Sequence, residues 1–139
     1  MKRLNVAIAE DEVLIADLLQ QIVETSGHAV VGCARTGDEL VTVVERERPD
    51  LVLVDIKLAR GSDGLAAAQT VQRRFGVPAI AITAHLTAEE AEKAGLLGFL
   101  SKPFTLRRVE QTLASAAEWL ERGETARPSR ADGAASSRA

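Results

Sequence analysis

The sequence predicts an α/β protein built on a doubly wound sheet of five parallel strands. Five short apolar runs alternate with five longer segments of helical periodicity, as expected for successive strand–helix units. Most of these runs are almost continuously apolar, which is typical of parallel strands covered by helices on both faces. The size agrees, because 139 residues, 46% of them hydrophobic, suffice for one domain with its own core.

The predicted strands lie at residues 4–9, 29–34, 51–55, 79–83 and 98–101. The third, LVLVD, is the most apolar and ends in Asp55. Cys33 falls in the second strand, where we expect a buried and inert packing residue. Since no partner His or Cys lies at metal-ligand spacing, we expect His28 and His85 to be solvent-facing loop residues.

The first two helices are predicted from the spacing of apolar residues. In the first, five such residues recur at near-helical intervals, and we expect them to form its buried face: Val13, Leu14, Leu18, Ile22 and Val23. The second helix carries Leu40, Val43 and Val44, and we expect it to end before the Arg48–Pro49 pair.

The last three helices are predicted from their end signals as well as their periodicity. The third spans residues 65–75, with Gly76 and Pro78 closing it. Thr87 followed by Glu90 is typical of a capping box at the start of a short fourth helix. The fifth spans residues 106–120. After it, residues 123–139 are small and polar, so we expect a folded domain over 1–122 and a disordered tail.

Composition excludes several classes of protein. A net charge of −3 and a pI of about 5.4 argue against nucleic-acid binding. The single cysteine excludes an internal disulfide framework and a cysteine-rich zinc site. No apolar stretch approaches the roughly 18 residues of a membrane span, and acidic residues interrupt the first apolar run, unlike in a signal peptide. We therefore expect a cytoplasmic protein.

Chemically active side chains follow four of the five predicted strands. They are Glu10 and Asp11 after the first, Asp55 at the end of the third, Thr83 at the end of the fourth and Lys102 after the fifth. Because ligands bind at the carboxyl ends of the strands in such sheets, we expect these groups to converge on one rim.

This combination of groups suits metal-dependent phosphoryl transfer. Three carboxylates in one place repel one another, and a hard divalent cation such as Mg²⁺ relieves that repulsion. A lysine and a hydroxyl can hold the remaining oxygens of a phosphoryl group. Asp55, alone at the end of its strand, is the candidate nucleophile, and its product would be an aspartyl phosphate.

Over about residues 4–121 the chain resembles the receiver domain of two-component response regulators. The resemblance is carried by the acidic pair in VAIAEDE, the aspartate in LVLVDIKL, the threonine in AIAITAH and the lysine in GFLSKPF. It implies a flavodoxin-like (βα)₅ fold with strand order 2-1-3-4-5. It also implies that Asp55 accepts a phosphoryl group from the phosphohistidine of a sensor histidine kinase or a histidine phosphotransferase, with Mg²⁺ organised by Glu10 and Asp11.

The resemblance assigns roles to further residues. It implies that the backbone carbonyl of Lys57 is a metal ligand, that Thr83 and Phe99 form the conformational switch, and that Lys102 pairs with the phosphoryl group. It implies a cis peptide bond between Lys102 and Pro103. We also expect the side chains of Lys57 and His85 to tune the lifetime of the phosphate. Ala59 stands where the family often has proline, which leaves the geometry of the following loop open.

These observations lead to a single-domain response regulator that is not a conventional enzyme. It would signal through the surface of its fourth helix, fifth strand and fifth helix, or pass the phosphoryl group on. The alternative is a pseudo-receiver that acts as an interaction or dimerisation module without phosphorylation. A haloacid-dehalogenase-type phosphatase needs a second acid where this chain has Lys57. The sequence leaves the downstream protein and the presence of a homodimer open.

Overall fold

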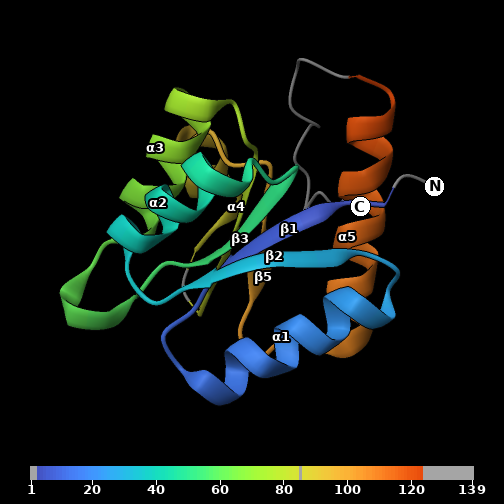
Figure 1. Ribbon diagram of the computed structural model, residues 1–139, viewed down its shortest axis with the longest axis horizontal. Coiled ribbons are helices and arrows are strands. Elements are labelled where there is room, and N and C mark those ends of the chain that lie inside the picture. The colour runs from blue at the N-terminus through green and yellow to red at the C-terminus, as the bar shows by residue number, and fades with distance from the viewer. Residues whose placement is uncertain (1–2, 85, 124–139) are drawn as a thin grey trace.

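A computed structural model describes residues 3–123 except His85, and all of their side chains except that of Arg60. Its centre is a parallel sheet of five strands in the order β2-β1-β3-β4-β5 (Figure 1). The strands are β1 (Asn5–Ala9), β2 (Ala29–Ala34), β3 (Leu51–Asp55), β4 (Ala79–Thr83) and β5 (Gly98–Ser101). The predicted fold class and strand order are confirmed, and β1 begins one residue later than predicted.

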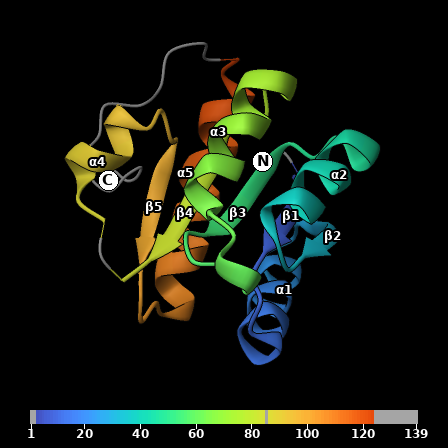
Figure 2. The ribbon, with the colours of Figure 1, turned by 90° about the vertical axis from the view of Figure 1, so that its left-hand side faces the viewer.

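Helices cover both faces of the sheet, as the apolar strands predicted. They are α1 (Val13–Thr25), α2 (Gly37–Glu47), α3 (Gly64–Phe75), α4 (Ala88–Lys93) and α5 (Leu106–Glu121). Figure 1 shows α1 and α5 on one side of the sheet and α2 and α3 on the other, and Figure 2 shows α4 beside β5. Strand residues alternate between two cores, with Leu53 facing α1 and α5 while Val52 and Val54 face α2 and α3.

Local side-chain chemistry fixes the helix ends. Thr36 caps α2 by accepting the backbone N–H of Glu39, and Asp63 caps α3 in the same way. The predicted capping box of Thr87 and Glu90 is present at α4. Gly76 ends α3 with a φ of 69°, a left-handed conformation that glycine adopts without strain.

The prediction for the buried face of α1 was wrong in part. Ile22 and Val23 are buried as expected, but Leu14 is 82% and Leu18 44% exposed, and Val13 is exposed as well. The helix buries Leu19 instead. Each residue advances the helix by about 100°, so a periodic apolar pattern can extend beyond the stripe that meets the sheet. The apolar stripe of α1 is therefore wider than the core requires.

Two further expectations were wrong because they depend on tertiary position. His28 is only 6% exposed, and its Nδ1 accepts the backbone N–H of Leu4 at 2.9 Å, so it is part of the fold and not a solvent-facing residue. Cys33 is exposed, because β2 lies at the edge of the sheet. Periodicity within a strand does not reveal which strand lies at an edge.

Within the described part of the chain, no helix has both the length and the apolar character needed to cross a bilayer. Of the predicted tail, residues 124–139 lie outside the described residues, and so does His85.

Candidate functional site

The carboxyl ends of the strands bring the predicted residues to one rim. Glu10 directly follows β1, while Asp55 ends β3, the neighbouring strand. Thr83 ends β4, and Lys102 directly follows β5. The backbone N–H of Lys102 donates to the carbonyl of Thr83 at 2.9 Å, which joins the ends of the last two strands.

Asp55 lies at the centre of this group and is only 5% exposed. Its Oδ2 accepts a hydrogen bond from Lys102 Nζ at 2.7 Å. Its Oδ1 accepts the backbone N–H of Lys57 at 2.9 Å. Both oxygens are therefore oriented, one by an ammonium group and the other by the loop that follows β3. The bond between Lys102 Nζ and Asp55 Oδ2 joins two charged groups, and at 2.7 Å it is among the stronger hydrogen bonds in proteins.

Glu10, Asp11 and Asp55 form an acidic cluster beside that lysine. One carboxylate oxygen from each lies within 4.8 Å of the others. Glu10 Oε2 accepts the backbone N–H of Glu12 at 3.2 Å. Glu10 Oε1 is buried and 3.7 Å from Lys102 Nζ, and among the described side chains it is the buried polar atom without a hydrogen-bond partner.

This cluster fits Mg²⁺. Its side-chain ligand atoms are hard carboxylate oxygens, which that cation prefers. The unpartnered Oε1 of Glu10 also supports a cation site, because a buried acceptor without a partner is unfavourable unless a cation or a water molecule satisfies it.

Burial and neighbouring charges shift the pKa values of two groups at the site, Glu10 and Lys102. Burial raises the pKa of the Glu10 carboxyl to about 7, with a further contribution from the Asp55 charge, against the opposing effects of the Glu12 N–H and Lys102. For Lys102, burial alone lowers the pKa. The hydrogen bond to Asp55 and the charges of Glu10 and Asp55 outweigh burial, so the pKa of Lys102 is above its ordinary value and it remains an ammonium group.

The remaining residues assigned by resemblance occupy varied positions. The peptide bond between Lys102 and Pro103 is cis, as expected. Phe99 is half-buried and packs against the core beneath α2, α3 and α4. The side chain of Lys57 is exposed, and the residue pairs with Asp63 across the loop in an isolated β-bridge. The roles of Lys57, His85, Thr83 and Phe99 stay predictions.

Sequence reasoning did not identify Gly64, the first residue of α3, as part of the site. A Cβ atom there would collide with the backbone carbonyl oxygen of Asp55. Gly64 thus allows α3 to begin directly against the backbone of Asp55. The sequence did offer a signal, the Asp63–Gly64 pair at the start of the third helix. Glycine is a poor helix former, so a glycine at the first position of a helix indicates that another segment passes close to it.

Comparison with known proteins agrees with this geometry. Residues 6–114 match the family described as the response regulator receiver domain. The chain belongs to this family. It is therefore a receiver domain of the kind found in two-component response regulators.

Several relatives support this membership. The phyllosphere-induced regulator PhyR of Methylorubrum extorquens is 44% identical over 117 residues, which is 81% of this chain and 43% of the relative. The transcriptional regulatory protein PdtaR of Mycobacterium tuberculosis is 38% identical over 105 residues, 73% of this chain and 51% of the relative. This receiver domain thus spans about half the length of the curated relatives it matches.

A solved structure closely resembles the receiver domain in fold. It is the solution NMR structure of the PhyR receiver (REC) domain from Erythrobacter litoralis, with 33% identity and a TM-score of 0.75. The match covers 95% of this chain and 98% of that one.

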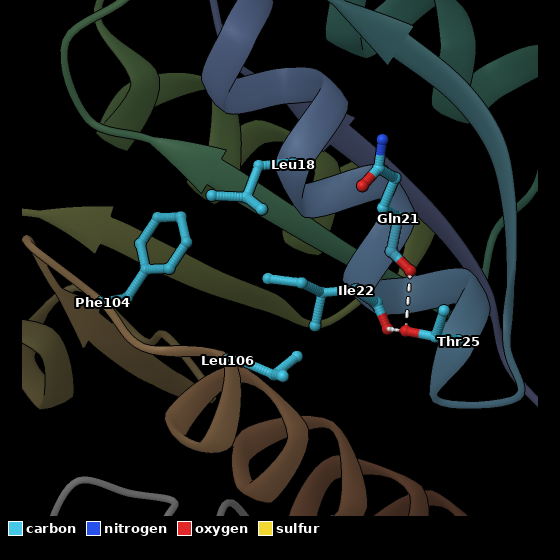
Figure 3. Close-up of a pocket in the computed structure, with 6 residues that line it drawn as sticks. All are labelled: Leu18, Gln21, Ile22, Thr25, Phe104 and Leu106. Atoms are coloured by element: carbon cyan, nitrogen blue, oxygen red, sulfur yellow. Dashed lines mark hydrogen bonds between the residues drawn. The ribbon is translucent and has the colours of Figure 1, made fainter.

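An apolar groove of the receiver domain lies between α1 and the segment that leads into α5 (Figure 3). Its volume is about 290 Å³, and its lining residues are Leu18, Gln21, Ile22, Thr25, Phe104 and Leu106. Figure 3 shows Leu18 and Ile22 from α1 facing Phe104 and Leu106 across the opening. Phe104 is two residues beyond Lys102, so the chain that forms one wall also carries the site's ammonium group.

Proposed function

We propose that this receiver domain accepts a phosphoryl group on Asp55 from the phosphohistidine of a histidine kinase or histidine phosphotransferase, in a reaction that requires Mg²⁺. The observation that carries the proposal is the position of the Asp55 carboxylate, held between Lys102 Nζ and the Lys57 N–H beside two further acids.

In this reaction an Asp55 oxygen attacks phosphorus, and the bond between phosphorus and the donor's imidazole nitrogen breaks. The electron pair of that bond stays with the imidazole. Lys102 moves its hydrogen bond from the carboxylate to a phosphoryl oxygen, and the Thr83 hydroxyl contacts another. Glu10, Asp11, Asp55 and the Lys57 carbonyl would hold Mg²⁺, which supplies charge neutralisation for the approach of two anions.

The groove between α1 and the segment that leads into α5 is the surface on which we propose that the phosphodonor docks. Its exposed leucines offer apolar area that the core does not use. We propose that an amphipathic helix of the donor seats there, because Phe104 in one wall of the groove is two residues beyond Lys102.

The output we propose is a shift between two conformations. When Lys102 and Thr83 turn toward the phosphoryl group, the contacts among β4, β5 and α4 change, and half-buried Phe99 can move inward. The altered surface of α4, β5 and α5 then binds a downstream protein, or the phosphoryl group passes to a phosphotransferase.

The test is incubation with Mg²⁺ and acetyl phosphate, followed by intact mass measurement of wild type and Asp55→Asn. We expect one phosphate adduct on wild type, and none on the variant or without Mg²⁺. Asparagine keeps the shape of the side chain but is not a nucleophile. If wild type takes no phosphate from acetyl phosphate or candidate kinases, and no beryllofluoride, the chain is a phosphorylation-independent pseudo-receiver.

A further inference from the structure

The loop between β3 and α3, residues 56–63, is closed on itself. The backbone N–H of Leu58 donates to the Ser62 carbonyl at 3.2 Å, and that of Ser62 donates to the Ala59 carbonyl at 3.1 Å. At the base, the N–H of Gly64 donates to the Ile56 carbonyl at 2.8 Å. The loop after Asp55 therefore has a defined conformation. The sequence had left this conformation open, because Ala59 stands where the family often has proline.

Ser62 fastens this loop to a different element. The backbone N–H of Gly37, the first residue of α2, donates to Ser62 Oγ at 2.7 Å. The first N–H groups of a helix have no partner within the helix. The cap residue of α2, Thr36, serves the N–H of Glu39 instead. Ser62 thus supplies a second cap to α2 from 25 residues away in the sequence.

Two further observations show that the contact is close and specific. The backbone N–H of Ala59 donates to the carbonyl of Arg35 at 3.1 Å, so one hydrogen bond joins the loop to the segment before α2 and another, to Gly37, joins it to α2 itself. A Cβ atom at Gly37 would lie 3.0 Å from Ser62 Oγ and 3.1 Å from the Cβ of Ala67. The loop is therefore held at its tip by α2 and at its base by the backbone of Asp55 and Ile56.

We propose that Ser62 is a positioning residue for the metal-dependent reaction at Asp55. Its hydroxyl fixes the loop that carries Lys57, whose N–H donates to Asp55 Oδ1 at 2.9 Å and whose carbonyl is, under the proposed function, a metal ligand. This inference rests on the proposed function. Groups that orient metal ligands usually affect metal affinity when they are removed, even though they do not touch the ion.

The experiment compares wild type with Ser62→Ala, Ser62→Thr and the control Ser115→Ala, which alters a half-buried serine on α5. Mg²⁺ affinity is measured without any phosphodonor, from the NMR shifts of the Lys57 and Leu58 amides. Hydrogen exchange of the Gly37 amide is measured in the metal-free protein. We expect Ser62→Ala to weaken Mg²⁺ binding about tenfold and to speed exchange at Gly37. Ser62→Thr, which keeps the hydroxyl, and Ser115→Ala should match wild type.

An unchanged Mg²⁺ affinity in Ser62→Ala would overturn the proposal, even with a lower unfolding midpoint, because the hydroxyl would then serve only the stability of α2. An equal loss of affinity in Ser62→Thr would also overturn it, since the hydroxyl would not be the group that matters. Failure of the proposed function looks different. In that case wild type itself binds no Mg²⁺ and takes no phosphate, and the role of Ser62 falls with it.

Discussion

Burial of the Glu10 side chain disfavours the charged form of its carboxyl group. It is only 3% exposed, one of its oxygens has no hydrogen-bond partner, and its pKa is raised to about 7. In the unfolded chain its pKa would be near 4.5. The folded metal-free protein therefore binds more protons than the unfolded chain between these values, and it loses stability as the pH rises through that interval. A site arranged for a cation is expected to behave in this way without one.

We expect Glu10→Gln to raise the unfolding free energy of the metal-free protein by about 1 kcal/mol at pH 8. The amide has nearly the same shape and carries no charge to desolvate. The gain should shrink toward pH 4.5, where the native carboxyl is already protonated. Urea unfolding at both pH values measures the difference, with the exposed neighbour Glu12→Gln as control. A variant less stable than wild type at pH 8 would show that Lys102 stabilises the charged form enough to offset burial.

His28 titrates with the opposite consequence. Burial, with a contribution from the charge of Arg3, lowers its pKa below 6.5, and its Nδ1 must stay unprotonated to accept the N–H of Leu4. The unfolded chain therefore takes up the proton first. The stability that His28 contributes is fully present above pH 6.5 and is lost as the pH falls below it.

We expect wild type to lose stability relative to His28→Asn as the pH falls from 7.5 to 5.5. Asparagine can accept a hydrogen bond but does not titrate. Because Glu10 titrates in the same range in both proteins, its effect cancels in the difference between their unfolding free energies. Thermal unfolding at four pH values gives that difference. A difference that stays constant with pH would show that His28 keeps the same pKa in the folded and unfolded states.

At the scale of elements, α1 shows that an apolar pattern can serve two surfaces. Leu19, Ile22 and Val23 are buried in the core, while Leu18 and Leu106 of α5 line the groove and are about half exposed. Their apolar area is available to a partner.

We therefore expect Leu18→Gln and Leu106→Gln to leave the unfolding midpoint and the rate of phosphorylation by acetyl phosphate unchanged. Transfer from a phosphohistidine-bearing protein should fall about tenfold or more, which corresponds to about 1.4 kcal/mol of lost contact. Phosphate transfer from the cognate donor, followed by gel autoradiography, measures this, with Glu45→Gln on the opposite side of the sheet as control. Equal losses with acetyl phosphate would indicate damage to the site instead of lost docking.

The same elements show what the sequence could predict. Strands and helices were predictable because the signals for each lie within its own stretch of sequence: an apolar run, a capping residue such as Thr87 or a glycine at the end of a helix such as Gly76. The convergence of Glu10, Asp55 and Lys102 was predictable because a parallel sheet brings the carboxyl ends of its strands together. The burial of His28 and the bond between Ser62 and Gly37 were not, since each depends on a contact between distant segments.

At the scale of the whole molecule, the two cores on either side of the sheet are built from residues 4–120. The core beneath α1 and α5 extends to the end of α5, where Ala116, Ala117 and Trp119 are buried. We therefore propose that the stable unit ends just beyond α5, as the change in composition near residue 123 predicts.

We expect a chain that ends at Gly123 to unfold within about 2 °C of the full-length protein, because it keeps every buried residue of both cores. It should also take phosphate from acetyl phosphate at the full-length rate.

A chain that ends at Ser115 is the matched comparison, because it also loses the buried Ala116, Ala117 and Trp119. Loss of a buried tryptophan alone removes about 3–5 kcal/mol, a large part of the stability of a domain this size, so the shorter chain should be mostly unfolded. Calorimetry of the three chains separates the outcomes. A midpoint several degrees lower for the chain ending at Gly123 would mean that the residues after it stabilise the receiver domain.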